Sequence, residues 1–209
     1  MSNVLVVLPL STLGLGAVLV YGVARLITRR NGVLAGVTTS LYLLGLMATL
    51  QVNTLVLASG PAVWSPSGVP EAVFQADPGA MLIAIVALAL GCVVAIYSGR
   101  YLALDHRYEY YYPLLLLLTA GVIGMVMAVD LFTIYLCTVL TSASSYILVA
   151  FRRRTETAIE AGFKYAVIGN MASIMMLAGI GFVFRSTGSL QLPLAAQDLG
   201  AWGALGVAL

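Results

Sequence analysis

Long apolar runs separated by short polar segments form the main pattern of this chain. About 20 apolar residues at a helical rise of 1.5 Å cross a hydrocarbon core of roughly 30 Å. We therefore expect spanning helices at residues 4–24, 32–50, 80–98, 113–129, 131–151 and 158–184, and the start of a seventh at 200–209. A transmembrane barrel would instead alternate apolar and polar residues over segments of about 10 residues. The pattern predicts an all-α, polytopic transmembrane helix bundle that forms a single membrane domain.

Residues 51–79 interrupt this pattern with four prolines, Pro61, Pro66, Pro70 and Pro78. Proline removes a helical hydrogen bond and clashes with the preceding turn, so a spanning helix is not expected here. We expect an extramembrane loop at 51–79 that is a candidate hairpin, in which Val52–Leu57 is a candidate short strand. Pro113 is expected in the first turn of the fourth span, where its missing N–H costs nothing.

The composition supports the membrane class, because 61% of the residues are hydrophobic and 9% are charged, whereas soluble domains are about one-quarter charged. A net charge of +2 gives no indication of nucleic acid as a partner. Cys92 and Cys137 lie inside apolar runs, where cysteine usually acts as a small hydrophobe, so no metal site is expected. The sequence has no nucleotide-binding loop, and no cofactor is expected. The first apolar run is long enough to span the membrane, so we expect no cleavable signal.

Lys164 lies inside the sixth span, and an ionisable residue in such a run is costly and therefore indicates function. A desolvated lysine has a lowered pKa and can relay a proton. Alternatively, its ammonium group snorkels to the interface and pairs with Glu160, four residues earlier. Spacing alone favours snorkelling. Asp130, the single charge between the fourth and fifth spans, is the third relay candidate.

Hydroxyl and amide side chains form a candidate polar helix face in the fifth and sixth spans, made by Thr138, Thr141, Ser142, Ser145 and Asn170. Such a face can line a file of water molecules. Small polar residues also allow membrane helices to pack closely. Ser142, Ser145 and Val149 fall on one helix face, which favours the packing interpretation.

Basic residues indicate the orientation of the chain. Alternate connections between spans lie on the same side of the membrane. One side holds Arg185 alone, and the other side holds the remaining nine of the ten lysine and arginine residues: Arg25, Arg29, Arg30, Arg100, Arg107, Arg152, Arg153, Arg154 and Lys164. Cytoplasmic loops of membrane proteins carry the excess of lysine and arginine. We therefore expect the N-terminus to be extracytoplasmic and the protein to be a multi-pass component of the plasma (inner) membrane.

Three segments resemble a known family. They are DLFTIYLC at 130–137, SSYILVAF at 144–151 and EAGFKY at 160–165, followed by RSTGSL at 185–190. Together they are similar to the antiporter-like membrane subunits of respiratory complex I, of Mrp-type sodium/proton antiporters and of membrane-bound hydrogenases. The resemblance extends over residues 80–209 and corresponds to the N-terminal part of such subunits.

The resemblance implies a membrane subunit that contributes to proton or sodium translocation, coupled to electron transfer or to cation exchange. Redox centres of the family lie in other subunits, so no active site of its own is implied, and whether the assembly is an enzyme stays open. Implied partners are the lipid bilayer, other membrane subunits and a second polypeptide that completes the subunit. Lys164 matches a family lysine, which strengthens the relay interpretation.

Two departures from the family pattern support an alternative function. The family glutamate of the fifth helix aligns with Val139, or beside it with Thr138, and neither side chain can carry a proton. The chain also ends at Leu209, before the next family lysine. The alternative is a structural, non-conducting subunit of the membrane arm.

The orientation can be tested with single cysteines at Ser67 and Thr155. An impermeant thiol reagent applied to intact cells should label Ser67→Cys and leave Thr155→Cys unlabelled, because the basic residues place position 155 in the cytoplasm. Labelling of Thr155→Cys in permeabilised cells is the control. Labelling of that variant from outside intact cells would contradict the topology.

Overall fold

A computed structural model describes residues 2–26, 31–65, 73–102, 108–151, 156–192 and 206–207. It contains eight elements, α1 (Ser2–Leu26), α2 (Asn31–Ser59), β1 (Ala62–Trp64), β2 (Phe74–Ala76), α3 (Pro78–Tyr101), α4 (Tyr108–Met127), α5 (Leu131–Val149) and α6 (Glu156–Thr187). Six helices are long and apolar enough to cross a membrane, which confirms the expected all-α bundle of six spans. The seventh predicted span lies outside the described residues except for 206–207, as does the arginine cluster at 152–154.

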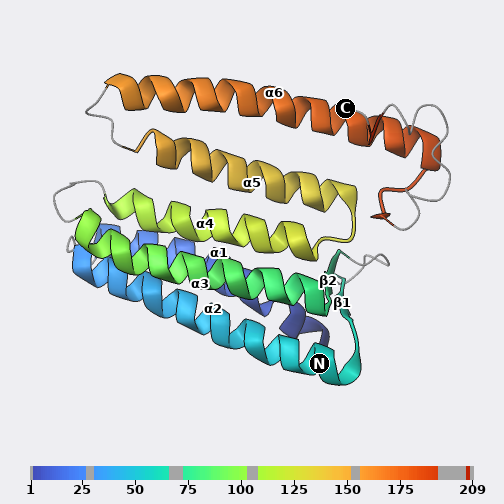
Figure 1. The fold of residues 1–209 in the computed structure, drawn as a ribbon, viewed down its shortest axis with the longest axis horizontal. Coiled ribbons are helices and arrows are strands. Elements are labelled where there is room, and N and C mark those ends of the chain that lie inside the picture. Colours follow the sequence, from blue (N-terminus) through green and yellow to red (C-terminus); the bar gives the residue numbers. More distant parts are fainter. Residues whose placement is uncertain are drawn as a thin grey trace.

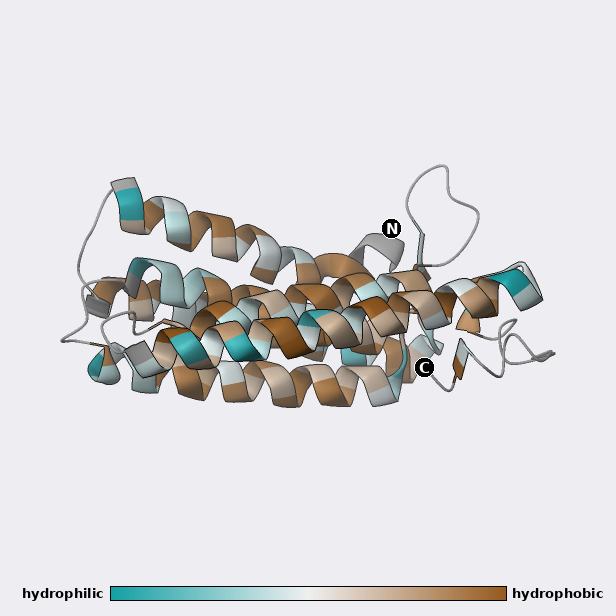
Figure 2. Cartoon of the chain, turned by 90° about the horizontal axis from the view of Figure 1, so that it is seen from above, coloured by the Kyte–Doolittle hydropathy of each residue, from teal (hydrophilic) through white to brown (hydrophobic). Residues whose placement is uncertain are grey.

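The helices lie side by side in an elongated bundle (Figure 1). α1 to α4 pack around one another, α5 packs on α4, and α6 packs on the far side of α5. Apolar residues cover most of the helix surfaces along their length (Figure 2). The buried core lies among the first four helices, while α5 and α6 form an outer pair.

α2 extends nine residues beyond its predicted end, and the strand predicted at Val52–Leu57 is wrong because those residues are helical. No proline or glycine occurs between Gly45 and Gly60, so nothing in the sequence stops the helix earlier. Gly60 ends it with a φ of +88°, and its N–H donates to the Val56 carbonyl at 2.9 Å. A glycine in this left-handed conformation is the usual C-terminal cap of a helix.

α4 begins at Tyr108, five residues before the predicted start, and places Pro113 inside the helix rather than in its first turn. The tyrosines that precede Pro113 are helical because they have partners in the bundle. Tyr112 is fully buried, and the Tyr111 hydroxyl accepts a hydrogen bond from Ser98 of α3 at 2.9 Å. Burial of aromatic surface thus offsets the hydrogen bond that Pro113 cannot donate.

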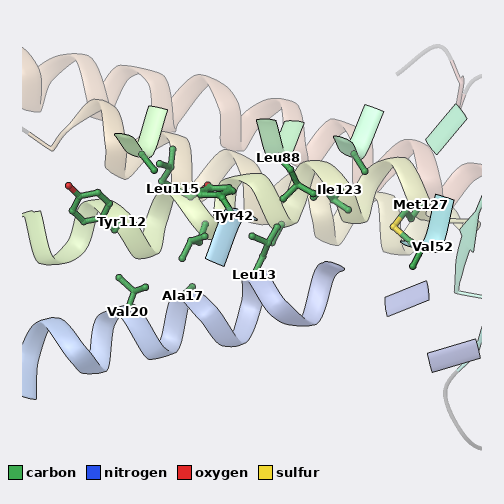
Figure 3. Close-up of a cluster of buried hydrophobic side chains, with 14 of the residues drawn as sticks. Leu13, Ala17, Val20, Tyr42, Val52, Leu88, Tyr112, Leu115, Ile123 and Met127 are labelled. Atoms are coloured by element: carbon green, nitrogen blue, oxygen red, sulfur yellow. The ribbon is translucent and has the colours of Figure 1, made fainter. Parts of the chain in front are cut away.

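The centre of the core is Tyr42 of α2, which is fully buried next to Leu88 and Leu115 (Figure 3). Its hydroxyl donates to the Leu115 carbonyl at 3.0 Å and lies 2.8 Å from Thr119 Oγ1, both on α4. Gly91 of α3 makes room for the ring, because a Cβ atom there would clash with Tyr42 Cε1. Tyr42 therefore joins α2, α3 and α4 through both its ring and its hydroxyl.

Four short extended segments meet at one end of the bundle. β1 and β2 form an antiparallel hairpin, with Ala62 opposite Ala76, which confirms the candidate hairpin. Val73 accepts a backbone hydrogen bond from Val129 at 3.1 Å, and Val129 accepts one from Leu192 at 3.0 Å. We call this arrangement of residues 62–64, 73–76, 128–131 and 190–192 the end sheet. It ties the α2–α3, α4–α5 and post-α6 connections together; its position outside the membrane stays a prediction.

Tyr42→Phe should lower the free energy of unfolding by about 1 kcal/mol, because it removes a buried interhelical hydrogen bond while keeping the ring in place. Tyr97→Phe is the matched control, since Tyr97 is 66% exposed. The measurement is reversible unfolding of each variant in bicelles. Equal losses in the two variants would contradict this account of the core.

Candidate functional site

Asp130, one of the three relay candidates, is the N-cap of α5. Its backbone is extended, with φ −118° and ψ 148°, and its Oδ2 accepts a hydrogen bond from the Thr133 N–H at 2.7 Å. A carboxylate at this place satisfies a free N–H and interacts favourably with the helix dipole. The second carboxylate oxygen, Oδ1, is buried and has no hydrogen-bond partner among the described residues. Asp130 therefore caps α5 through Oδ2, while Oδ1 accepts no hydrogen bond from the described residues.

The hydroxyls of the predicted polar face donate to carbonyls of their own helix. Thr138 donates to Ile134 at 2.8 Å, Thr141 to Cys137 at 2.9 Å, and Ser145 to Ser142 at 2.7 Å. Such bonds satisfy a hydroxyl in an apolar surrounding without a partner helix. All three hydroxyls therefore bond to the backbone of α5 and not to another side chain.

The α4–α5 interface uses glycines of α4 as the close-approach positions. A Cβ atom at Gly121 would clash with the Thr141 hydroxyl and the Cys137 carbonyl, and one at Gly124 would lie 2.7 Å from Cys137 Sγ. Small residues allow membrane helices to approach in this way. Thr141 therefore lies in a helix–helix contact, as the packing interpretation expects for a residue of this face.

α6 runs antiparallel to α5 and contacts it through its own glycines. A Cβ atom at Gly162 would meet Ala150, and one at Gly169 would meet the hydroxyl of Tyr146. The rings of Tyr146 and Tyr165 are 4.8 Å apart at 77°, an edge-to-face contact. The start of α6 therefore lies beside the end of α5.

Lys164 and Glu160 form an ion pair on α6, with 2.6 Å between Lys164 Nζ and Glu160 Oε1. The two side chains are 68% and 63% exposed. Four residues make about one helical turn, so the two share a face. Gly162 and Gly169 contact α5, and Lys164 is displaced from both by roughly half a turn of the helix. The pair therefore lies on the outer face of α6, away from the other five helices.

The structure brings together Lys164 and Glu160 but separates them from Asp130. A backbone bridge joins Asp130 to Gln191, beyond the end of α6, whereas Lys164 lies about two turns from the beginning of α6. Asn170 is exposed on α6, and Val139 is half-buried on α5. Within the described ranges, no group of three or more His, Cys, Asp or Glu residues could hold a metal ion.

Sequence reasoning missed a pocket of 640 Å³ at the end of the bundle where α5 ends and α6 begins. Its walls come from α1, α4, α5 and α6, and include Tyr21, Tyr110, Ile147 and Ala166. Hydropathy along the chain carries no signal for such a pocket, because its lining residues come together only when the four helices pack.

Residues 128–205 match a family model described as NADH:quinone oxidoreductase/Mrp antiporter, TM. The chain is 33% identical over 116 residues to F(420)H(2) dehydrogenase subunit N of Methanosarcina mazei, covering 56% of this chain and 24% of that protein. It is 30% identical over 195 residues to NADH-quinone oxidoreductase subunit N of Parvibaculum lavamentivorans, covering 93% of this chain and 38% of that protein. The chain thus spans about a quarter to two-fifths of the length of the curated relatives it matches.

The fold is similar to that of subunits in solved membrane complexes. A chain of the archaeal membrane-bound sulfane sulfur reductase superposes with a TM-score of 0.79 at 23% identity, covering 99% of this chain and 42% of that one. A chain of the Mrp complex from Dietzia sp. gives 0.75 at 22% identity, covering 99% and 38%. A chain of respiratory complex I from Thermus thermophilus gives 0.72 at 22% identity, covering 96% and 41%. The comparisons confirm the resemblance that the segments at 130–137, 144–151 and 160–165 indicated.

Asp130→Ala should lower the free energy of unfolding by about 1 kcal/mol, the usual cost of a lost N-cap. Asp130→Asn should retain most of that stability, because asparagine caps a helix as well as aspartate. Asp77→Ala is the matched control, since Asp77 is the N-cap of α3 but makes no side-chain capping bond. Reversible unfolding measures all three. An Asp130→Asn variant as unstable as Asp130→Ala would show that the charge, not the cap, matters.

Proposed function

Because this chain carries the antiporter-like transmembrane domain over residues 128–205 and has the fold of such subunits, we propose that it contributes to proton or cation translocation in a multi-subunit membrane complex. The observation that supports this best is that three comparisons agree. They are the family model, a relative aligned over 93% of the chain, and a solved structure that superposes over 99% of it. The relatives and solved structures are named as parts of respiratory and Mrp assemblies. We propose a similar assembly, in the plasma membrane, for this protein.

We propose Lys164 as the proton-carrying group and Glu160 as its partner. In water, an exposed pair spaced by four residues stabilises a helix by only about 0.3–0.5 kcal/mol, so stability alone gives little reason for it. An ionisable side chain within a membrane span is costly and usually marks an ion path or a proton relay. The pairing of Lys164 with Glu160 in such a span supports the relay.

The place of the pair on the outer face of α6 supports a path between α6 and a neighbouring protein. An ion pair facing lipid tails would be costly unless other polar groups or water covered it. We therefore propose that another membrane subunit, or a second polypeptide that completes this one, packs over Glu160 and Lys164. The remaining candidates, Asp130 and the α5 hydroxyls, would then act mainly in packing and capping.

The alternative function, a structural subunit that conducts nothing, is favoured by Val139. This half-buried side chain stands on α5 where the family pattern has a glutamate, and it offers no group that could take a proton. The hydroxyls Thr138, Thr141 and Ser145 also use their protons within their own helix. Variants of Lys164 separate the two functions.

Lys164→Met should lower ion translocation by the assembled complex about tenfold or more, because a relay group that transfers protons cannot be replaced by a thioether. Lys164→Arg should fail as well, since arginine keeps its charge but does not release its proton. Translocation is measured in inverted membrane vesicles, with subunit content as the control for assembly. Normal translocation in Lys164→Arg would indicate snorkelling, and normal translocation in both variants would favour the structural alternative.

A further inference from the structure

The pocket between α1, α4, α5 and α6 lies at the end of the bundle where the basic residues Arg25 and Arg100 end α1 and α3. Its volume of 640 Å³ falls within the range of about 300–1,000 Å³ that is usual for small-molecule sites. α5 finishes and α6 starts at this end of the bundle (Figure 1). None of its lining residues belongs to the Lys164–Glu160 pair or to the end sheet.

The walls of the pocket are mainly apolar. Pro113 and Leu114 of α4, Ile147 and Ala150 of α5, and Ala166 of α6 contribute to them. Ile147 is 50% exposed, so the pocket opens to the outside of the bundle rather than being sealed within it. In a membrane, a half-open apolar pocket on the bundle surface faces the acyl chains of the bilayer.

The rim carries groups that suit a phosphate. Tyr21 lines the pocket, and its hydroxyl accepts a hydrogen bond from Arg25 Nη1 at 3.0 Å. The Tyr21 ring contacts that of Tyr110, with 6.0 Å between the centroids. Arg25 is exposed, and its planar guanidinium has further N–H groups with the geometry that binds phosphate oxygens. Glu109 lies within electrostatic range of Arg25, so the rim carries both signs of charge.

We propose that this pocket binds a membrane phospholipid, with one acyl chain between α4, α5 and α6 and the phosphate against Arg25 and Tyr21. The apolar walls match an acyl chain, and the guanidinium of Arg25, which is bonded to the pocket residue Tyr21, matches a phosphate. Tyr21 and Tyr110 place amphipathic rings between the two regions, as tyrosines do at membrane interfaces. A transmembrane helix of another protein fits poorly, because a helix is about 10–12 Å wide and 640 Å³ holds fewer than about two of its turns.

The lipid would fill a gap in the packing of the outer helix pair. α6 contacts the bundle mainly through α5, and the pocket separates the first turns of α6 from α1 and α4. An acyl chain against Ala150 and Ala166 would join these elements without a direct side-chain contact. This site is independent of the translocation proposal, because it uses neither Lys164 nor Glu160.

Native mass spectrometry of the full chain tests the proposal, after exchange into vesicles of phosphatidylethanolamine and phosphatidylglycerol (3:1) and extraction in mild detergent. Arg25→Gln and Ala166→Phe should each lose about one retained phospholipid per chain relative to the unmodified protein. Arg100→Gln and Ala172→Phe are the matched controls, because both positions are exposed and lie outside the pocket. Equal retention by all of these proteins would overturn the site. Loss in Ala166→Phe alone would overturn the assignment of the phosphate to Arg25.

A photo-crosslinking residue in place of Ile147 identifies the occupant directly in native membranes, where the protein has its natural partners. The expected product is this chain with the added mass of one phospholipid. Crosslinking to another polypeptide, or only to detergent and water after extraction, would overturn the proposal. Because this readout does not involve ion translocation, failure of the proposed function would leave it unaffected.

Discussion

Hydrocarbon offers no partner for a backbone N–H or carbonyl, so each spanning segment must satisfy its own polar groups. The side chains of this protein follow the same constraint. Thr38, Thr39 and Ser40 of α2 donate to carbonyls one turn earlier, as Thr138 and Thr141 of α5 do. Hydroxyls therefore place few demands on neighbouring helices. Apart from the hydrogen bonds of Tyr42 and of Ser98 with α4, the helix contacts described here depend on shape, and glycines set how closely the helices approach.

The first four helices and the outer pair, α5 and α6, pack in different ways. α1 to α4 enclose a core in which Tyr42 supplies both bulk and an interhelical hydrogen bond. α5 and α6 meet each other and α4 through Gly121, Gly162 and Gly169, and they leave wide apolar surfaces uncovered. The Glu160–Lys164 pair lies on one of these surfaces. This exposed pair is the group on which the proposed translocation rests.

The sequence predicted the number and type of the spans, because the thickness of the bilayer fixes the length of the apolar run, about 20 residues, that a spanning helix needs. It misplaced the end of α2 and the start of α4, because capping and local packing decide where a helix begins and ends. The prolines beyond Gly60 do not act on residues 51–59, so α2 continues to Ser59. Tyr111 and Tyr112 pack in the bundle, so α4 begins before Pro113. The Glu160–Lys164 pair was predictable from its spacing, since one helix makes it. The fifth span was expected to begin at residue 131, where α5 does begin, so the sequence already placed Asp130 just before the helix. The pocket could not be predicted, because it needs the packing of four helices.

The end sheet has a consequence for how the protein is made. Its hydrogen bonds join Val73 to Val129 and Val129 to Leu192, residues that leave the ribosome at widely separated times. The hairpin reaches its final side of the membrane when α2 and α3 are in place, but its edge stays unpaired until the α4–α5 turn arrives beside it. The last pairing then waits for α6 to be threaded completely. Closure of the end sheet therefore requires the α2–α3, α4–α5 and post-α6 connections to reach the same side of the membrane, and a chain in which they do not would keep open strand edges.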